Sequence, residues 1–173
     1  MRSGRPASGT DRVERLWTPW RMEYIQAAKV DPEGCIFCEL PEKGDDDAAH
    51  ILKRGERAFV LMNAYPYNPG HLMVAPYRHT GEIEHLDADE LLDLGRLLQV
   101  AMRALREEME PHGFNLGMNL GRIAGAGIPD HLHWHVVPRW SGDTNYMPVI
   151  GQTRVLPELL EETYRKLHPR FVG

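Results

Sequence analysis

The chain has 173 residues, of which 42% are hydrophobic and 26% are charged, and its formal net charge is −5 at neutral pH. This length and apolar content suit one domain with its own core. The acidic balance argues against a nucleic-acid groove and a basic membrane-binding patch, and no apolar run is long enough to span a bilayer.

Residues 1–11 are small and polar. They lack the apolar middle of a signal peptide, so we expect a flexible tail followed by one domain over residues 12–173. The cysteines fit a reducing compartment better than a disulfide scaffold, because the chain has only two of them. We therefore expect a cytoplasmic protein.

The segment 12–28 mixes aromatic and charged residues. Proline suits the first turn of a helix, so a short helix is predicted from Pro19. The large apolar side chains of this segment need burial, either on the domain's own sheet, across a dimer interface or against a base. These side chains are Trp17, Trp20, Met22, Tyr24 and Ile25.

Cys35 and Cys38 form a Cys-x-x-Cys pair that allows more than one interpretation. A redox pair would normally open a helix within a thioredoxin-like unit, and the sequence does not indicate such a unit. A structural zinc site needs two further ligands. His50 is one candidate ligand by composition alone.

Two short apolar runs, residues 58–62 and 71–75, are bounded by turn-forming residues. They predict two antiparallel strands, joined by a linker over residues 65–70 that is rich in proline, asparagine and glycine. A third strand is predicted over residues 115–120.

Asp87 and Glu90 have the spacing of a helix capping box. Apolar residues then follow at three- and four-residue steps, which predicts an amphipathic helix with this stripe in the core, ending before Pro111. The stripe is Leu91, Leu94, Leu98, Ala101, Leu105 and Met109. A last helix is predicted over residues 156–167, with Pro157 in its first turn.

A glycine-rich loop over residues 121–130 connects Asn119 to a histidine-rich stretch. Glycines let backbone amides approach an anion and point at it, and Arg122 could offset phosphate charge. Such loops are often simple turns, but this one directly precedes the histidines.

His131, His133 and His135 occupy alternate positions, so on a strand they would line one face. Leu132, Trp134 and Val136 would line the other face, against a core, and Pro138 would end the strand. Such a row suits a nucleophile or an acid–base group, but it also suits a tris-histidine metal site. Solvent-exposed histidines that happen to alternate are less favoured, because protonated neighbours repel one another.

The stretch from His131 to Val137 resembles the signature of the histidine-triad family, His-x-His-x-His followed by two apolar residues. The resemblance extends over roughly residues 16–140. Asn63, eight positions before His71, matches the family's strand-turn-strand segment, and Asn119 with the glycines after it matches the phosphate loop. Residues 16–25 together with Cys35-Ile-Phe-Cys38 look like the bacterial branch that includes diadenosine tetraphosphate phosphorylases.

The resemblance implies an α+β, HIT-like fold with a five-stranded antiparallel sheet, a long helix and a C-terminal helix. Family members usually pair two such sheets, so we expect a homodimer or a dimer of dimers. The resemblance also implies adenine nucleotides and dinucleoside polyphosphates as substrates, with no organic cofactor.

In this family His133 would attack an α-phosphorus and form a nucleotidyl-histidine, while His135 and His71 would hold phosphate oxygens or supply a proton. Asn63 would bind ribose. Trp140 would cover a base or simply pack at the rim. The remaining nucleotide-binding candidates are Asn119, Gly125, Gly127 and His131.

The resemblance also supplies the two missing zinc ligands, His79 and His131, beside Cys35 and Cys38. We therefore expect a structural zinc ion, with His131 committed to it.

The acceptor of the transferred nucleotide decides the reaction. Common hydrolase branches of the family carry a glutamine and a Ser or Thr shortly before the first histidine, where this chain has Gly127 and Ile128. This departure favours phosphorolysis of diadenosine tetraphosphate to ATP and ADP, with inorganic phosphate as the acceptor. The alternatives are a hydrolase of dinucleoside polyphosphates or nucleoside phosphoramidates, a tris-histidine metalloenzyme, and a nucleotide-binding module without useful turnover.

Overall fold

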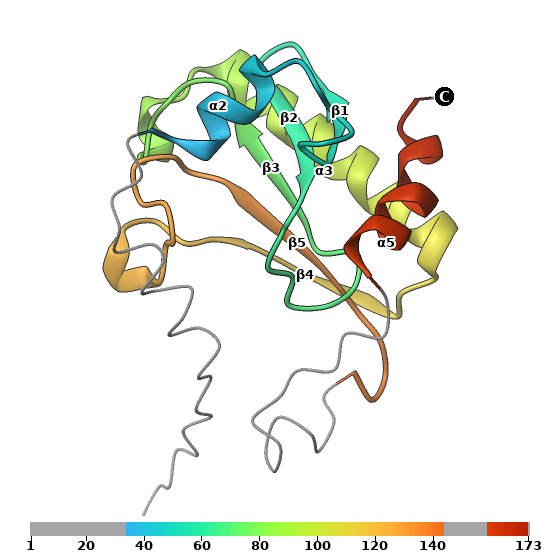
Figure 1. Ribbon diagram of the computed structural model, residues 1–173. Coiled ribbons are helices and arrows are strands. Elements are labelled where there is room, and N and C mark those ends of the chain that lie inside the picture. The colour runs from blue at the N-terminus through green and yellow to red at the C-terminus, as the bar shows by residue number, and fades with distance from the viewer. Residues whose placement is uncertain (1–33, 144–158, 173) are drawn as a thin grey trace, which may run out of the picture.

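The computed structural model describes residues 34–143 and 159–172. The predicted tail over residues 1–11, the start of the domain at residue 12 and the aromatic segment 12–28 lie outside these ranges. Five antiparallel strands form one sheet in the order β1-β2-β3-β5-β4 (Figure 1), as the resemblance implied. The strands are β1 (Ile51–Arg54), β2 (Ala58–Met62), β3 (Leu72–Pro76), β4 (Gly113–Met118) and β5 (Trp134–Arg139).

The central strands β2 and β3 are apolar throughout because both of their faces are covered. They pair from Ala58↔Pro76 to Met62↔Leu72, and all of their residues are buried. Alternate side chains therefore enter two different cores. Val60 and Val74 belong to the core under the long helix, whereas Phe59 and Met73 belong to the core on the opposite face.

The long helix α3 (Ala88–Met109) covers one face of the sheet, and its predicted capping box is confirmed. The Glu90 amide donates to Asp87 Oδ1 at 2.8 Å, and the Asp87 amide donates to Glu90 Oε2 at 2.9 Å. The predicted stripe was wrong at Leu91, which is 44% exposed. Glu90 is buried in its place, one turn before Leu94, because the buried stripe is rotated from the predicted one. The buried stripe continues through Leu97, Ala101, Ala104 and Leu105.

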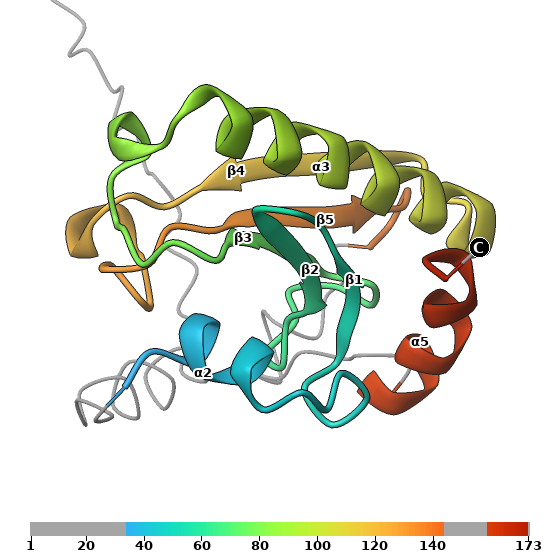
Figure 2. The same ribbon diagram turned by 90° about the horizontal axis from the view of Figure 1, so that it is seen from above.

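Within the described residues, two shorter α-helices accompany α3, namely α2 (Ile36–Glu42) and α5 (Leu160–Leu167). Helix α2 lies on the face of the sheet opposite α3 (Figure 2). Helix α5 packs beside α3. The sequence places the start of α5 at residue 156, but Leu159 is its extended N-cap and residues 156–158 lie outside the described ranges.

Two strand boundaries differ from the prediction. Strand β4 begins at Gly113 and ends at Met118, two residues before the predicted end. Strand β5 begins at Trp134, so His131 and His133 precede it, and Pro138 lies inside the strand. The β3–β5 pairing stops at Leu72↔Val136. Pro138 lies beyond that ladder, where its missing N–H does not break β3–β5 pairing.

Among the described residues, no helix combines the length and the apolarity that crossing a bilayer requires.

Candidate active site and metal centre

The histidine row and its apolar counterpart point to opposite sides, as predicted, but of the three histidines only His135 lies within β5. Leu132 and Val136 are buried in the core under α3, and Trp134 packs against that core. His133 lies on the other face, where the Phe37 ring of α2 packs against it at a centroid distance of 4.6 Å. The apolar face therefore anchors the segment, and the imidazoles are presented towards α2.

The position of the proton on His133 follows from its surroundings. Its Nδ1 lies 3.0 Å from the main-chain oxygen of His131. A carbonyl oxygen only accepts, so Nδ1 carries the proton and Nε2 holds the lone pair. Burial lowers the pKa of His133, which keeps the ring neutral.

The Nε2 atom of His133 remains accessible although the residue is only 6% exposed. None of the described residues bonds to this atom, and every fully buried side-chain nitrogen or oxygen in the described part of the chain has a partner. Nε2 is therefore not fully buried. A neutral ring with an accessible lone pair is a nucleophile that needs no prior deprotonation.

His71 and His135 form a hydrogen-bonded pair beside His133. The Tyr67 amide donates to His71 Nδ1 at 3.1 Å, so the proton of His71 is on Nε2. That Nε2–H lies 3.0 Å from His135 Nδ1, which therefore accepts, and the proton of His135 is on Nε2. Burial lowers the pKa of His135 to about 4. Its ring is 4.9 Å from that of His133, centroid to centroid.

Asn63 lies in the same group and contacts His71. Its Oδ1 accepts from the Tyr65 amide at 2.9 Å, which turns Nδ2 towards His71 Nδ1 at 3.3 Å. The structure thus brings Asn63 together with the histidines, at the point where the loop leaves β2.

The glycine-rich loop adjoins the start of β5 (Figure 1). Gly121 and Gly125 have positive φ values of 78° and 93°, which glycine adopts without strain. The Asn119 side chain reaches the Gly125 carbonyl at 3.5 Å. In the part of the chain that the structure describes, the amides of Gly127 and Ile128 donate to no residue. Such amides can bind an anion.

Cys35, Cys38, His79 and His131 converge, and one donor atom of each lies within 4.8 Å of all the others. Cys35 Sγ is 3.2 Å and Cys38 Sγ is 3.6 Å from His131 Nδ1, and Cys38 Sγ is 3.4 Å from His79 Nδ1. Ligands around a tetrahedral zinc ion, with Zn–S of about 2.3 Å and Zn–N of about 2.0 Å, are roughly 3.5 Å apart. The donor set and its spacing therefore fit zinc.

Three elements hold these ligands in place. Cys35 is the N-cap of α2 and Cys38 lies in its first turn, so the two thiols are on the same side of the helix. His131 Nε2 donates to the Pro76 carbonyl at 2.9 Å, which leaves Nδ1 free to face the thiols. The loop that carries His79 is tied to the histidine segment, because the Leu132 amide donates to Thr80 O at 2.7 Å.

The protonation of the ligands is set mainly by burial. It lowers the pKa of His131 to about 4, so this ring is neutral and able to ligate. It also raises the pKa of Cys38 to about 11, with the Cys35 charge as a further cause. A metal ion must therefore displace a thiol proton, which makes its affinity fall with falling pH.

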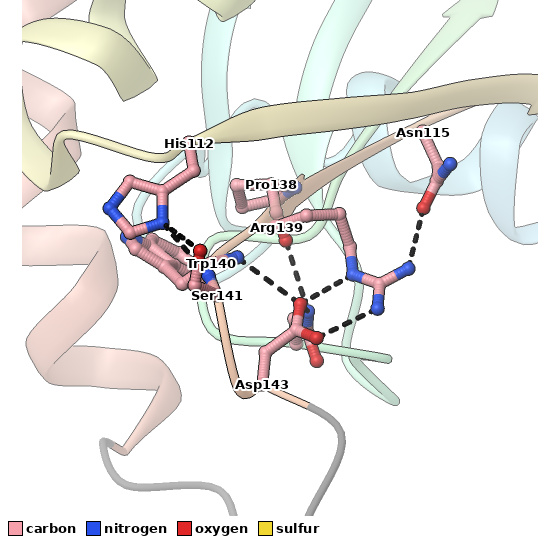
Figure 3. A network of polar contacts seen from close by, with 8 residues as sticks. His112, Asn115, Pro138, Arg139, Trp140, Ser141 and Asp143 are labelled. Carbon is pink, nitrogen blue, oxygen red and sulfur yellow. Dashed lines mark hydrogen bonds and ion pairs between the residues drawn. The ribbon is translucent and has the colours of Figure 1, made fainter.

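Trp140 is not brought together with His71, His133 and His135; it lies beside His112 at the other end of β5 (Figure 3). It has the same parity along the strand as Val136, so its side chain lies on the α3 face, and its indole N–H donates to the Met109 carbonyl at 3.1 Å. Trp140 therefore packs at the rim of the sheet, at the end of β5 opposite the histidine row. His50 likewise lies away from the thiols, in edge-to-face contact with Tyr164 at 5.3 Å.

Phe37 and the Tyr67 amide are the contributions to the site that the sequence did not reveal. Phe37 packs against both His131 and His133. Its position between the two cysteines of a Cys-x-x-Cys motif was the available signal. Tyr67 contributes its main-chain amide and also its ring, which packs against His71 at a centroid distance of 4.6 Å and against His135 at 5.8 Å.

A row of imidazoles on a five-stranded antiparallel sheet, beside a glycine loop, defines a histidine-triad type of site. The HIT domain family model matches residues 45–142. The AP-4-A phosphorylase of Mycobacterium tuberculosis is 44% identical over 164 residues, which cover 91% of this chain and 84% of that protein. The chain therefore belongs to the HIT family.

More distant relatives and solved structures agree with this assignment. The bis(5'-nucleosyl)-tetraphosphatase [asymmetrical] of Schizosaccharomyces pombe is 27% identical over 112 residues, covering 65% of this chain and 58% of that protein. A Zn-bound histidine triad family protein from Mycobacterium smegmatis superposes with a TM-score of 0.64 and 27% identity. That match covers 79% of this chain and 92% of the other.

Proposed function

We propose that this chain is a nucleotidyl-transferring enzyme that cleaves diadenosine tetraphosphate with inorganic phosphate to give ATP and ADP. The observation that carries the proposal is the accessible lone pair on His133 Nε2, which the bond from Nδ1 to the His131 carbonyl maintains. The identity of 44% to an AP-4-A phosphorylase supports the substrate class.

In the first step, His133 Nε2 attacks the α-phosphorus of one adenosine. A P–N bond forms, the P–O bond to the rest of the polyphosphate breaks, and ATP leaves. In the second step, an oxygen of inorganic phosphate attacks the same phosphorus, the P–N bond breaks, and ADP forms. Two steps through a covalent intermediate replace one more difficult displacement.

The other residues stabilise charge and position the nucleotide. The Nε2–H groups of His135 and His71 donate, and that of His135 is the candidate for holding a phosphate oxygen or protonating the leaving group. Asn63 is the candidate for the ribose. The phosphate is proposed to bind at Asn119, Gly125 and Gly127, with the amides of Gly127 and Ile128 as donors.

We also propose a structural zinc ion on Cys35, Cys38, His79 and His131, which the spacing of these donors supports. It would supply no step of the reaction; it would fix His131, whose main-chain oxygen orients His133. The free thiols suit a reducing compartment, which supports a cytoplasmic location.

The second candidate function is hydrolysis, in which water takes the place of phosphate and AMP replaces ADP. The products distinguish the two. Purified protein is incubated with diadenosine tetraphosphate, with and without phosphate, and the nucleotides are separated. We expect ATP and ADP to form in repeated turnovers only when phosphate is present; without phosphate, at most one ATP per chain is released as the covalent intermediate forms. Equal release of AMP in both conditions would assign the protein to the hydrolases.

A further inference from the structure

Asn68 ties the loop between β2 and β3 to the end of β5. Its Nδ2 donates to the Pro138 carbonyl at 3.0 Å and to Asp143 Oδ2 at 2.9 Å. Both neighbours are acceptors and the amide nitrogen has two hydrogens, so the orientation of this amide is determined and both of its donors are used. The Pro138 and Asp143 acceptors lie about seventy residues further along the chain.

The acceptor side of this link is itself held in place (Figure 3). Arg139 donates to Asp143 Oδ1 at 2.7 Å and, through Nε, to Oδ2, and the Trp140 amide donates to Oδ2 at 3.2 Å. The guanidinium holds the pKa of Asp143 well below its usual range, so the carboxylate is charged. Hydrogen bonds to a charged acceptor are stronger than neutral ones. Asn115 also belongs to this network, since its Oδ1 accepts from Arg139 Nη1 at 2.7 Å.

The loop side of the link closes around His71. The His71 amide donates to the Asn68 carbonyl at 3.1 Å, and the Tyr67 amide donates to His71 Nδ1 at 3.1 Å. Asn68 therefore lies between two parts of this loop. On one side is the Tyr67 amide, which makes His71 Nδ1 an acceptor, and on the other is the main-chain turn that leads into β3. A shift of Asn68 would move the Tyr67 amide away from Nδ1 and leave that atom to the longer contact with Asn63 Nδ2 at 3.3 Å.

We propose that Asn68 is a positioning residue that sets the tautomers of His71 and His135. While it holds the loop, the protons of both rings stay on Nε2. If His71 instead carried its proton on Nδ1, its Nε2 would accept, and His135 would have to donate from Nδ1. His135 Nε2 would then offer a lone pair where an N–H is needed. This catalytic consequence rests on the proposed function; the tautomer assignment does not.

The test compares Asn68→Ala with Asn115→Ala, which removes a bond of the same network without touching the loop. Long-range ¹H–¹⁵N NMR spectra of the histidine side chains report the tautomer directly. The wild type and Asn115→Ala should show the Nε2–H form for His71 and His135, and Asn68→Ala should show His71 exchanging between both forms. We expect kcat of Asn68→Ala to be about tenfold lower, with KM within about twofold, because misplacement affects the transition state more than binding.

Asn68→Asp provides a second variant of the same size that lacks the amide hydrogens, and backbone spectra of β3 and β5 check that each variant is folded. In Asn68→Asp, His71 should exchange between its two tautomers as it does in Asn68→Ala. An unchanged Nε2–H form in both Asn68 variants would overturn the proposal, as would an equal effect of Asn115→Ala. Absence of dinucleotide turnover in the wild type would overturn the proposed function instead, and the NMR comparison would still decide the role of Asn68.

Discussion

Main-chain groups determine where the protons lie on the histidine rings of this site. The carbonyls of Pro76 and His131 accept from His131 Nε2 and His133 Nδ1, respectively. The Tyr67 amide donates to His71 Nδ1. Because peptide groups do not change their donor or acceptor character, each ring is held in one tautomer. These tautomers are thus set before any substrate binds.

The first prediction at the residue scale concerns the nucleophile. His133→Ala should lower the turnover of diadenosine tetraphosphate by at least about 10³-fold, because the covalent route is lost. Turnover is measured from product formation. The covalent nucleotidyl-histidine is trapped by denaturing the protein while it turns over labelled substrate. His85→Ala, which removes a solvent-exposed histidine, serves as the control. Full turnover in His133→Ala would eliminate this assignment.

The second prediction concerns pH and His135. Its pKa is about 4 in the folded protein, below the value of about 6.5 expected in the unfolded chain. Between these values the unfolded chain binds a proton that the folded one does not, so the free energy of unfolding should fall as the pH drops from 6.5 towards 4. Urea unfolding over this range should show a weaker pH dependence in His135→Gln than in the wild type. An identical dependence would contradict the burial of a neutral ring.

The alternating histidines and the Cys-x-x-Cys pair could be predicted as site residues because they are short-range patterns, whereas Asn63 was predicted only through the resemblance to the family. The sequence could not identify the partners of these groups. Pro76 and His131 are 55 residues apart, and only packing of the loops brings them together. Trp140 shows the same limit, since the strand parity that puts it on the α3 face depends on β5 continuing through Pro138.

At the scale of elements, the first turn of α2 places its two thiols next to His131 and His79. Phe37 lies between the two cysteines and packs on His131 and His133, so the helix contributes to the candidate metal centre and to the histidine row together. Loss of the proposed zinc ion should therefore loosen both.

The third prediction follows from this arrangement. Purified wild type should contain about one zinc ion per chain by elemental analysis, and Cys35→Ser/Cys38→Ser should contain almost none, with a lower Tm. His50 lies outside the cluster, so the variant His50→Ala should retain the metal. If the cysteine variant kept its metal and a chelator abolished its activity, the tris-histidine metalloenzyme would be the better description.

Element boundaries were predictable where the signal was local. The capping box of α3 and the ends of β2 depend on neighbouring residues, and the sequence placed them correctly. The exposure of Leu91 was not predictable, because it depends on how α3 is rotated against the sheet. The late start of β5 was missed for a similar reason: His131 and the adjoining loop pack against the His79 loop, where the Leu132 amide bonds to Thr80 O and not to a strand.

At the scale of the molecule, β4 is an edge strand of the sheet. Leu116 on this strand is 44% exposed, Leu120 is 40% exposed, and Ile123 is fully exposed. An exposed apolar edge favours pairing with another chain. We propose that two chains form a homodimer along β4, or a dimer of such dimers.

The fourth prediction tests this edge. Light scattering coupled to gel filtration should give at least twice the mass of one chain, and Leu116→Arg should shift the protein towards the monomer, because a charge would have to be buried at the interface. Val172→Arg, the same kind of aliphatic-to-arginine change at an exposed apolar position near the C-terminus, should not change the mass. A monomeric wild type would refute the dimer.

His131 contributes two separate groups to the site. Its ring faces the thiols, and its main-chain oxygen orients the ring of His133. Replacement of the side chain removes a ligand but leaves the oxygen in the chain. No substitution at this position can delete the group that orients the proposed nucleophile, so a descendant of this protein could lose the proposed metal site one ligand at a time and keep the same lone pair on His133 Nε2.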